Sequence, residues 1–127
     1  MNSFLNEAQK MQESLVQDRR WLHAHPEVGG SLPNTVAYVK KRLEEIGAPG
    51  QEICDSGLVV LLGGKKPGPC ILLRADMDAL PMKEESGLPF ASTCDRAAHT
   101  CGHDMHTAMM LGVVRLLRAH EDELCGT

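Results

Sequence analysis

The fold class rests on Cys70-Ile71-Leu72-Leu73, four consecutive apolar residues that lead into Arg74-Ala75-Asp76-Met77-Asp78. A strand that is apolar at every position is covered on both of its faces, so this stretch predicts a central strand of a sheet. Two further apolar runs, at 51–54 and 58–62, are bounded by turn residues and predict shorter strands. Helical patterns lie on either side of these strands. The order of elements therefore predicts a layered α/β domain.

Three segments carry the apolar spacing of amphipathic helices. The first runs from Asn2 to His25, where Pro26 ends it. The second begins at Asn34, a residue suited to cap it, and ends before Gly47, where a left-handed C-cap belongs. The third covers about 104–120. Its buried face is expected to consist of Met105, Met109, Val113, Leu116 and Leu117.

Composition excludes several functional classes. Of the 127 residues, 43% are apolar, and 13 basic residues stand against 17 acidic ones for a formal charge of -4. A nucleic-acid-binding protein would show a basic stripe and aromatic platforms, whereas this chain has only one Trp, one Tyr and two Phe. No apolar run approaches the roughly twenty residues that span a bilayer. The five cysteines are odd in number and lack framework spacing. They indicate reduced thiols and a cytoplasmic protein.

A dense cluster of potential metal ligands runs through His99-Thr100-Cys101-Gly102-His103-Asp104-Met105-His106. A thiolate and an imidazole two residues apart can bind one ion if the backbone turns tightly, which Gly102 permits. Asp104 is suited to cap the following helix or to orient a ligand histidine. From the residues alone, the alternative is a buried small cysteine with surface histidines. A zinc finger is excluded, because no second ligand pair follows at the required spacing.

Two other segments carry candidate polar residues. Asp76 and Asp78 leave the predicted strand two residues apart, so their side chains would point the same way and repel each other unless a cation or Arg74 lay between them. A solvated exit from the strand is the alternative. His23 and His25 do not share a helix face, and Pro26 follows. They indicate a structural helix end.

Taken in order, three segments resemble one known family. The segments are Leu22-His23-Ala24-His25-Pro26-Glu27, Leu72-Leu73-Arg74-Ala75-Asp76-Met77-Asp78-Ala79-Leu80-Pro81 and His99-Thr100-Cys101-Gly102-His103-Asp104-Met105-His106-Thr107. The chain resembles the amidohydrolase branch of peptidase family M-twenty, which includes hippurate, N-acyl-amino-acid and auxin-conjugate hydrolases. The resemblance extends from about Leu15 to Leu117.

The resemblance implies a fold and a set of site residues. Residues 1–127 would be the N-terminal portion of a three-layer α/β catalytic domain of the zinc-exopeptidase type, incomplete and without the lid and dimerisation domain. The full-length family uses two divalent ions, for which Mn²⁺, Zn²⁺, Co²⁺ and Ni²⁺ are the candidates. Cys101 and His103 match metal ligands, and Asp78 matches an acid that supports the metal centre. Three further candidates would either support the metal ligands from behind or face the substrate: Asp76, Asp104 and His106.

The resemblance also implies an activity. Relatives hydrolyse the amide bond of small N-acyl amino acids and are often homodimers, and neither nucleic acid nor membrane is an expected partner. Their general-base glutamate belongs to a Glu-Glu pair beyond the equivalent of Leu117, which this sequence lacks. We therefore expect a truncated hydrolase that is inactive alone. The alternatives are an inactive fragment, a non-catalytic metal-binding remnant, or a zinc-ribbon module, which would need four ligands.

Overall fold

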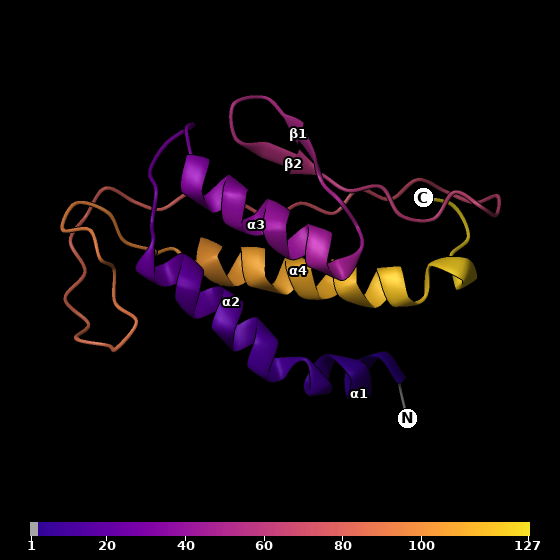
Figure 1. The fold of residues 1–127 in the computed structure, drawn as a ribbon, viewed down its shortest axis with the longest axis horizontal. Helices are drawn as coiled ribbons and strands as arrows, with labels where there is room; N and C mark the ends of the chain where they lie inside the picture. Colours follow the sequence, from indigo (N-terminus) through magenta and orange to yellow (C-terminus); the bar gives the residue numbers. More distant parts are fainter. Residues whose placement is uncertain (1–2) are drawn as a thin grey trace.

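Residue pattern and structure agree that helical regions precede and follow a small sheet in the chain. The computed structural model describes residues 3–127, so Asn2 of the first predicted helix lies outside the described residues. In Figure 1, α4 runs between α2 and α3, and the β1–β2 hairpin lies beside α3. In chain order the elements are α1 (Ser3–Lys10), α2 (Gln12–Ala24), α3 (Pro33–Ile46), β1 (Gln51–Ile53), β2 (Gly57–Val59), α4 (His103–Ala119) and the 3₁₀ turn η1 (Glu121–Glu123).

Helix α4 is the centre of the packing, because it contacts α1, α2 and α3. The predicted bounds of this helix differ from the observed ones by one residue, but the predicted buried face is wrong. Met105 and Met109 are 48% and 57% exposed. The helix turns polar Asp104 and Thr107 inward instead, because both have hydrogen-bond partners there. The hydrophobic core consists of Leu22, Val39, Leu43, Ala48, Leu111 and Val114.

The first predicted helix is two helices. The break falls at Met11, whose backbone N–H donates to the carbonyl of Ala8 at 3.1 Å, a bond to residue i−3 in place of i−4. The ladder resumes when Leu15 N–H donates to the Met11 carbonyl at 3.0 Å. Helix α2 then ends at Ala24, as the following proline predicts.

A carboxylate from outside α3 caps the start of that helix. Asn34, the predicted cap, lies inside the helix, which begins at Pro33. Glu27 accepts hydrogen bonds from the backbone N–H of Thr35 at 2.6 Å and of Asn34 at 3.2 Å. Burial acts to raise the pKa of Glu27, but these hydrogen bonds outweigh it and lower the pKa. At the other end, Gly47 is left-handed at φ 78°, as predicted.

Replacing Glu27 should therefore destabilise the fold. We expect Glu27→Ala to lower the free energy of unfolding by about 1 kcal/mol, the usual value of an N-cap. Urea unfolding followed by circular dichroism measures this change. Glu44→Ala, at an exposed position near the other end of α3, is the control. Equal stability of the two variants would show that Glu27 does not act as a cap.

The predicted central strand is not part of a sheet among residues 3–127. The described sheet has two antiparallel strands, with Gln51 opposite Val59 and Ile53 opposite Gly57. Ile71, Leu72 and Leu73 are 68%, 88% and 54% exposed. Pairing begins only at their N-terminal side. There Thr127 N–H donates to the Pro69 carbonyl at 3.0 Å, and Ile71 N–H donates to the Thr127 carbonyl at 2.8 Å. The apolar run lacks partners on both faces because no described segment covers it.

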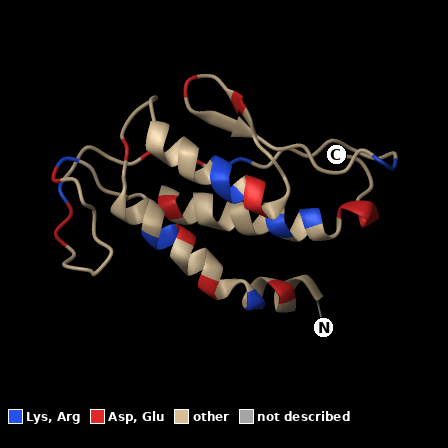
Figure 2. Ribbon diagram, in the orientation of Figure 1, with Lys and Arg blue, Asp and Glu red and all other residues tan. Residues whose placement is uncertain are grey.

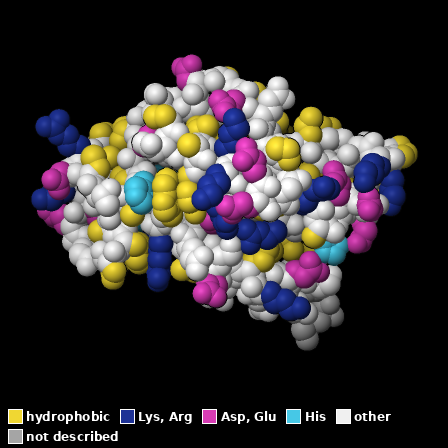
Figure 3. All heavy atoms as spheres, in the orientation of Figure 1, with side chains coloured by type: hydrophobic (Ala, Val, Ile, Leu, Met, Phe, Trp, Pro, Cys, Tyr) yellow, Lys and Arg dark blue, Asp and Glu magenta, His cyan; other side chains and the backbone are white. Residues whose placement is uncertain are grey.

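Charges and apolar side chains are mixed over the surface. Figure 2 shows acidic and basic residues interspersed along the helices and loops, and the face in Figure 3 shows hydrophobic side chains scattered among them. This distribution fits the near-balanced composition and differs from a basic stripe. No helix among the described residues has the length and apolar character needed to cross a membrane.

Candidate metal centre

Three side chains from two segments meet at the first turn of α4. Asp76 follows the apolar run 70–73, and His103 and His106 lie three residues apart on the helix. One potential ligand atom from each residue lies within 4.8 Å of those of the other two. Asp76 and His103 are partly buried and His106 is exposed. A carboxylate with two imidazoles is a donor set that suits divalent transition metals, so the residues present fit such an ion.

Asp78 fixes the ring of His103. The Asp78 carboxylate Oδ1 and backbone carbonyl lie 2.9 and 3.0 Å from His103 Nδ1. Because both oxygens can only accept, Nδ1 carries the hydrogen, and in the neutral ring Nε2 then has the free lone pair. His103 Nε2 lies 4.0 Å from the Asp76 carboxylate. The free nitrogen is therefore on the side of the three-residue group.

The backbone around this group is held from both segments. Gly102, the residue before α4, is left-handed at φ 95°, a conformation that glycine permits there. Thr107 Oγ1 lies 2.9 Å from the Asp76 carbonyl and 3.0 Å from the His103 carbonyl, so one hydroxyl ties the loop to the helix. The Arg74 guanidinium pairs with Asp76 at the rim and offsets its negative charge.

The sequence-predicted site residues do not all meet. His103, Asp76 and Asp78 lie together, and His106 joins them. Cys101 is exposed and is not part of the three-residue group. Its role as a metal ligand stays a prediction.

Asp104 faces away from this group, into the contact between α4 and α2. It is 1% exposed and makes no cap for α4, contrary to one of its predicted roles. Its Oδ2 accepts hydrogen bonds from Arg19 Nε at 2.8 Å and lies 2.7 Å from His23 Nδ1. The histidine that Asp104 orients is therefore His23, on another helix.

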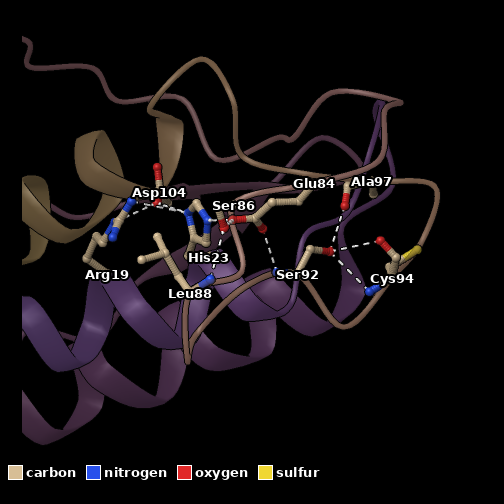
Figure 4. A network of polar contacts seen from close by, with 9 residues as sticks. All are labelled: Arg19, His23, Glu84, Ser86, Leu88, Ser92, Cys94, Ala97 and Asp104. Atoms are coloured by element: carbon tan, nitrogen blue, oxygen red, sulfur yellow. Dashed lines mark hydrogen bonds and ion pairs between the residues drawn. The ribbon is translucent and has the colours of Figure 1, made fainter.

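His23 and Glu84 belong to a network that sequence reasoning missed (Figure 4). His23 Nε2 lies 3.0 Å from Glu84 Oε1, and the Ser92 N–H donates to Glu84 Oε2 at 2.6 Å. Burial acts to raise the pKa of Glu84, but hydrogen bonds from Ser86, Ser92 and His23 outweigh it and hold the pKa at about 2. Two signals in the sequence involve His23: it belongs to the first of the three family-like segments, and it follows Arg19 by one helical turn, which is a common spacing. Neither signal indicates a contact with Glu84.

The low pKa of Glu84 makes the free energy of unfolding depend on pH in the acidic range. The folded-state pKa of about 2 lies below the ordinary value of 4.5. The stabilisation by ionised Glu84 is therefore complete above pH 4.5 and is lost as the pH falls toward 2. We expect Glu84→Gln to lower stability at neutral pH and to flatten this acid dependence. Urea unfolding across the same pH range tests it, with the exposed neighbour variant Glu85→Gln as control. Parallel acid profiles for wild type and Glu84→Gln would contradict the assignment.

A cavity of about 430 Å³ adjoins the network, and its lining includes His23, Glu84 and His99. His99 is 6% exposed, and neither ring nitrogen has a hydrogen-bond partner among the described residues. Burial lowers the pKa of His99, against a smaller raising effect of Asp104. His99 is therefore a buried imidazole at the cavity wall, and burial disfavours its protonation.

Sequence comparison gives the relatives of this chain. Residues 72–127 match the model of peptidase family M20/M25/M40. The chain is 41% identical over 117 residues to the N-acetyl-L-cysteine deacetylase of Bacillus subtilis, covering 91% of this chain and 28% of that protein. It is 38% identical over 109 residues to the N-acyl-L-amino acid amidohydrolase of Geobacillus stearothermophilus, covering 85% and 30%. The chain thus spans less than a third of the length of these curated relatives.

Comparison with solved structures also finds relatives of this chain. The YXEP protein of Bacillus subtilis, a dinuclear metal-binding peptidase from the M20 family, matches with a TM-score of 0.87 at 38% identity, over 93% of this chain and 34% of that one. A protein from methicillin-resistant Staphylococcus aureus matches with a TM-score of 0.92 at 34% identity, over 99% and 34%. The fold is that of part of an α/β domain of the M20 peptidase type. The predicted relationship to peptidase family M20 is confirmed.

Proposed function

We propose that this chain supplies part of a divalent-metal centre in a hydrolase that cleaves the amide bond of N-acyl amino acids. The observation that carries the proposal is the group of Asp76, His103 and His106, whose ligand atoms lie within 4.8 Å of one another. Relatives named as a deacetylase and an amidohydrolase of acylated amino acids support this class of substrate. A structural relative described as a dinuclear metal-binding peptidase supports a centre with two metal ions.

The proposed roles follow the donor atoms. His103 is a metal ligand through Nε2, and Asp78 orients it by accepting from Nδ1. Asp76 and His106 join it as ligands, a closer role than the outer-shell one that the sequence predicts. Cys101 is retained as a ligand from the sequence prediction. A bound Mn²⁺, Zn²⁺, Co²⁺ or Ni²⁺ would supply a Lewis acid that acidifies water and polarises an amide carbonyl.

The protein's own residues shape access to this centre. His106 is exposed and the Asp76 side chain is 30% exposed, so a small substrate can approach from solvent. Arg74, paired with Asp76, offers a cation near the site to a carboxylate-bearing substrate. For the whole protein we also propose two ions, a homodimer and a cytoplasmic location, as in the family that the sequence resembles.

Metal binding tests the assigned ligands. We expect the 127-residue chain to bind Mn²⁺ or Zn²⁺ in isothermal titration calorimetry, and His103→Ala to abolish binding because a donor atom is lost. Asp78→Asn should weaken binding about 10–100-fold, the usual cost of losing the group that orients a ligand. His25→Ala is the control, since its ring bonds only locally to the Trp21 carbonyl. Unchanged binding by Cys101→Ser would remove that residue from the ligand set.

Turnover by the chain alone is a separate test. The described group offers three ligand atoms. A catalytic zinc ion alone uses about three protein ligands, so these atoms are too few for the two ions of the proposed centre. We therefore expect no hydrolysis of hippurate or acetyl-amino acids by the 127-residue chain with added Mn²⁺. The Geobacillus stearothermophilus amidohydrolase serves as the positive control. Robust metal-dependent turnover by the chain would refute the expectation that the site is incomplete.

A further inference from the structure

The first turn of α4 has no side-chain cap from the described residues. Gly102, which has no side chain, is the residue before the helix. The position and rotation of this turn therefore depend on contacts made by its side chains. His103 and Thr107 contact the Asp76–Asp78 segment on one side, and Asp104 contacts α2 on the other.

The contact on the α2 side is the more deeply buried. The Asp104 side chain is inaccessible to solvent, and the His23 side chain is 7% exposed. The His23 ring lies between two carboxylates, with Nδ1 2.7 Å from Asp104 and Nε2 3.0 Å from Glu84. A buried charge that loses its partner is costly, because the low-dielectric surroundings do not solvate it. Among residues 3–127 the second oxygen of Asp104 has no hydrogen-bond partner, so His23 and Arg19 are the groups that compensate this carboxylate.

The same ring also holds the loop that leads into the metal centre. Glu84 lies at the start of that loop, and Ser92 donates to it from further along. Phe90 meets the His23 ring edge-on, with centroids 5.6 Å apart, and the Arg19 guanidinium lies 5.0 Å from the Phe90 centroid. Figure 4 shows His23 between Asp104 on α4 and Glu84 on the loop.

We propose that His23 is a positioning residue for the metal ligand His103, and that it acts through Asp104. His103 and Asp104 are consecutive on α4, so the bond from His23 to Asp104 sets the rotation of the turn that presents His103 to the ion. This inference rests on the metal centre of the proposed function. It adds a residue of α2 that lies outside the three-residue group and whose side-chain hydrogen-bond partners, within the described part of the chain, are Arg19, Asp104 and Glu84.

A cobalt titration tests the inference. Co²⁺ binds imidazole and carboxylate donors and reports its coordination through its visible absorption. We expect His23→Gln to weaken Co²⁺ binding about 10-fold, the lower end for loss of an outer-shell partner, and to shift the absorption bands at saturating Co²⁺. His25→Gln, two residues away on the same helix end, should bind like wild type. The band shift separates positioning from general stability, because a loss of stability alone lowers the bound fraction without changing the spectrum.

A double-mutant cycle tests the route through Asp104. If His23 acts through that carboxylate, Asp104→Asn and His23→Gln together should weaken Co²⁺ binding no more than the more severe single change. Additive losses would overturn the route. Wild-type binding and an unshifted spectrum in His23→Gln would overturn the positioning role while leaving the metal centre intact.

Two further results complete the set. Failure of the wild-type chain to bind Co²⁺, Mn²⁺ or Zn²⁺ would overturn the proposed metal centre and this inference together. If His23→Gln loses its helical circular dichroism, Asp104→Asn alone replaces it. In that case, wild-type affinity and spectrum in Asp104→Asn would overturn the inference.

Discussion

The buried carboxylate of Asp104 is the constraint on which the rest of the structure depends. It lies where α2 meets α4, and its compensation comes from Arg19 and His23 on α2. An acidic group at this depth is tolerated only with such partners, so the two helices have one relative rotation. That rotation turns Asp104 and Thr107 inward and leaves Met105 and Met109 exposed. The polar contact, rather than the apolar stripe, sets which face of α4 is buried.

The same rotation presents the candidate ligands. With Asp104 facing α2, its neighbour His103 faces the exit of the 70–78 segment, where Asp78 receives it. His106 follows on the same side one turn later, with its ring centroid 5.3 Å from that of His103. The candidate metal centre and the helix contact are thus on two sides of one helical turn. At this turn two consecutive residues are held by different parts of the chain: His103 by Asp78 and Asp104 by α2.

The sequence predicts the α3 and α4 regions well, because apolar spacing and the left-handed Gly47 depend on local physics. It also places Asp76 and His103 in one site, on the strength of ordered motifs. It does not predict that Glu27 caps α3, because the loop between them must fold back over eight residues, or that His23 is buried, because its partner Asp104 lies 81 residues away. The predicted buried face of α4 is wrong because it, too, depends on polar partners elsewhere in the chain. A periodicity gives the helix, whereas the face it buries is decided by partners elsewhere in the chain.

The exposed run of Ile71, Leu72 and Leu73 has a consequence for handling the polypeptide. Its backbone pairs with Thr127 at one end and then continues with no strand from the described part of the chain beside it. Unpaired apolar edges recruit other edges, and natural proteins normally protect them with charge, proline or a covering segment. The nearest such residues, Pro69 and Arg74, flank the run rather than lie within it. We therefore expect self-association of the 127-residue chain to begin at this edge and to rise with concentration.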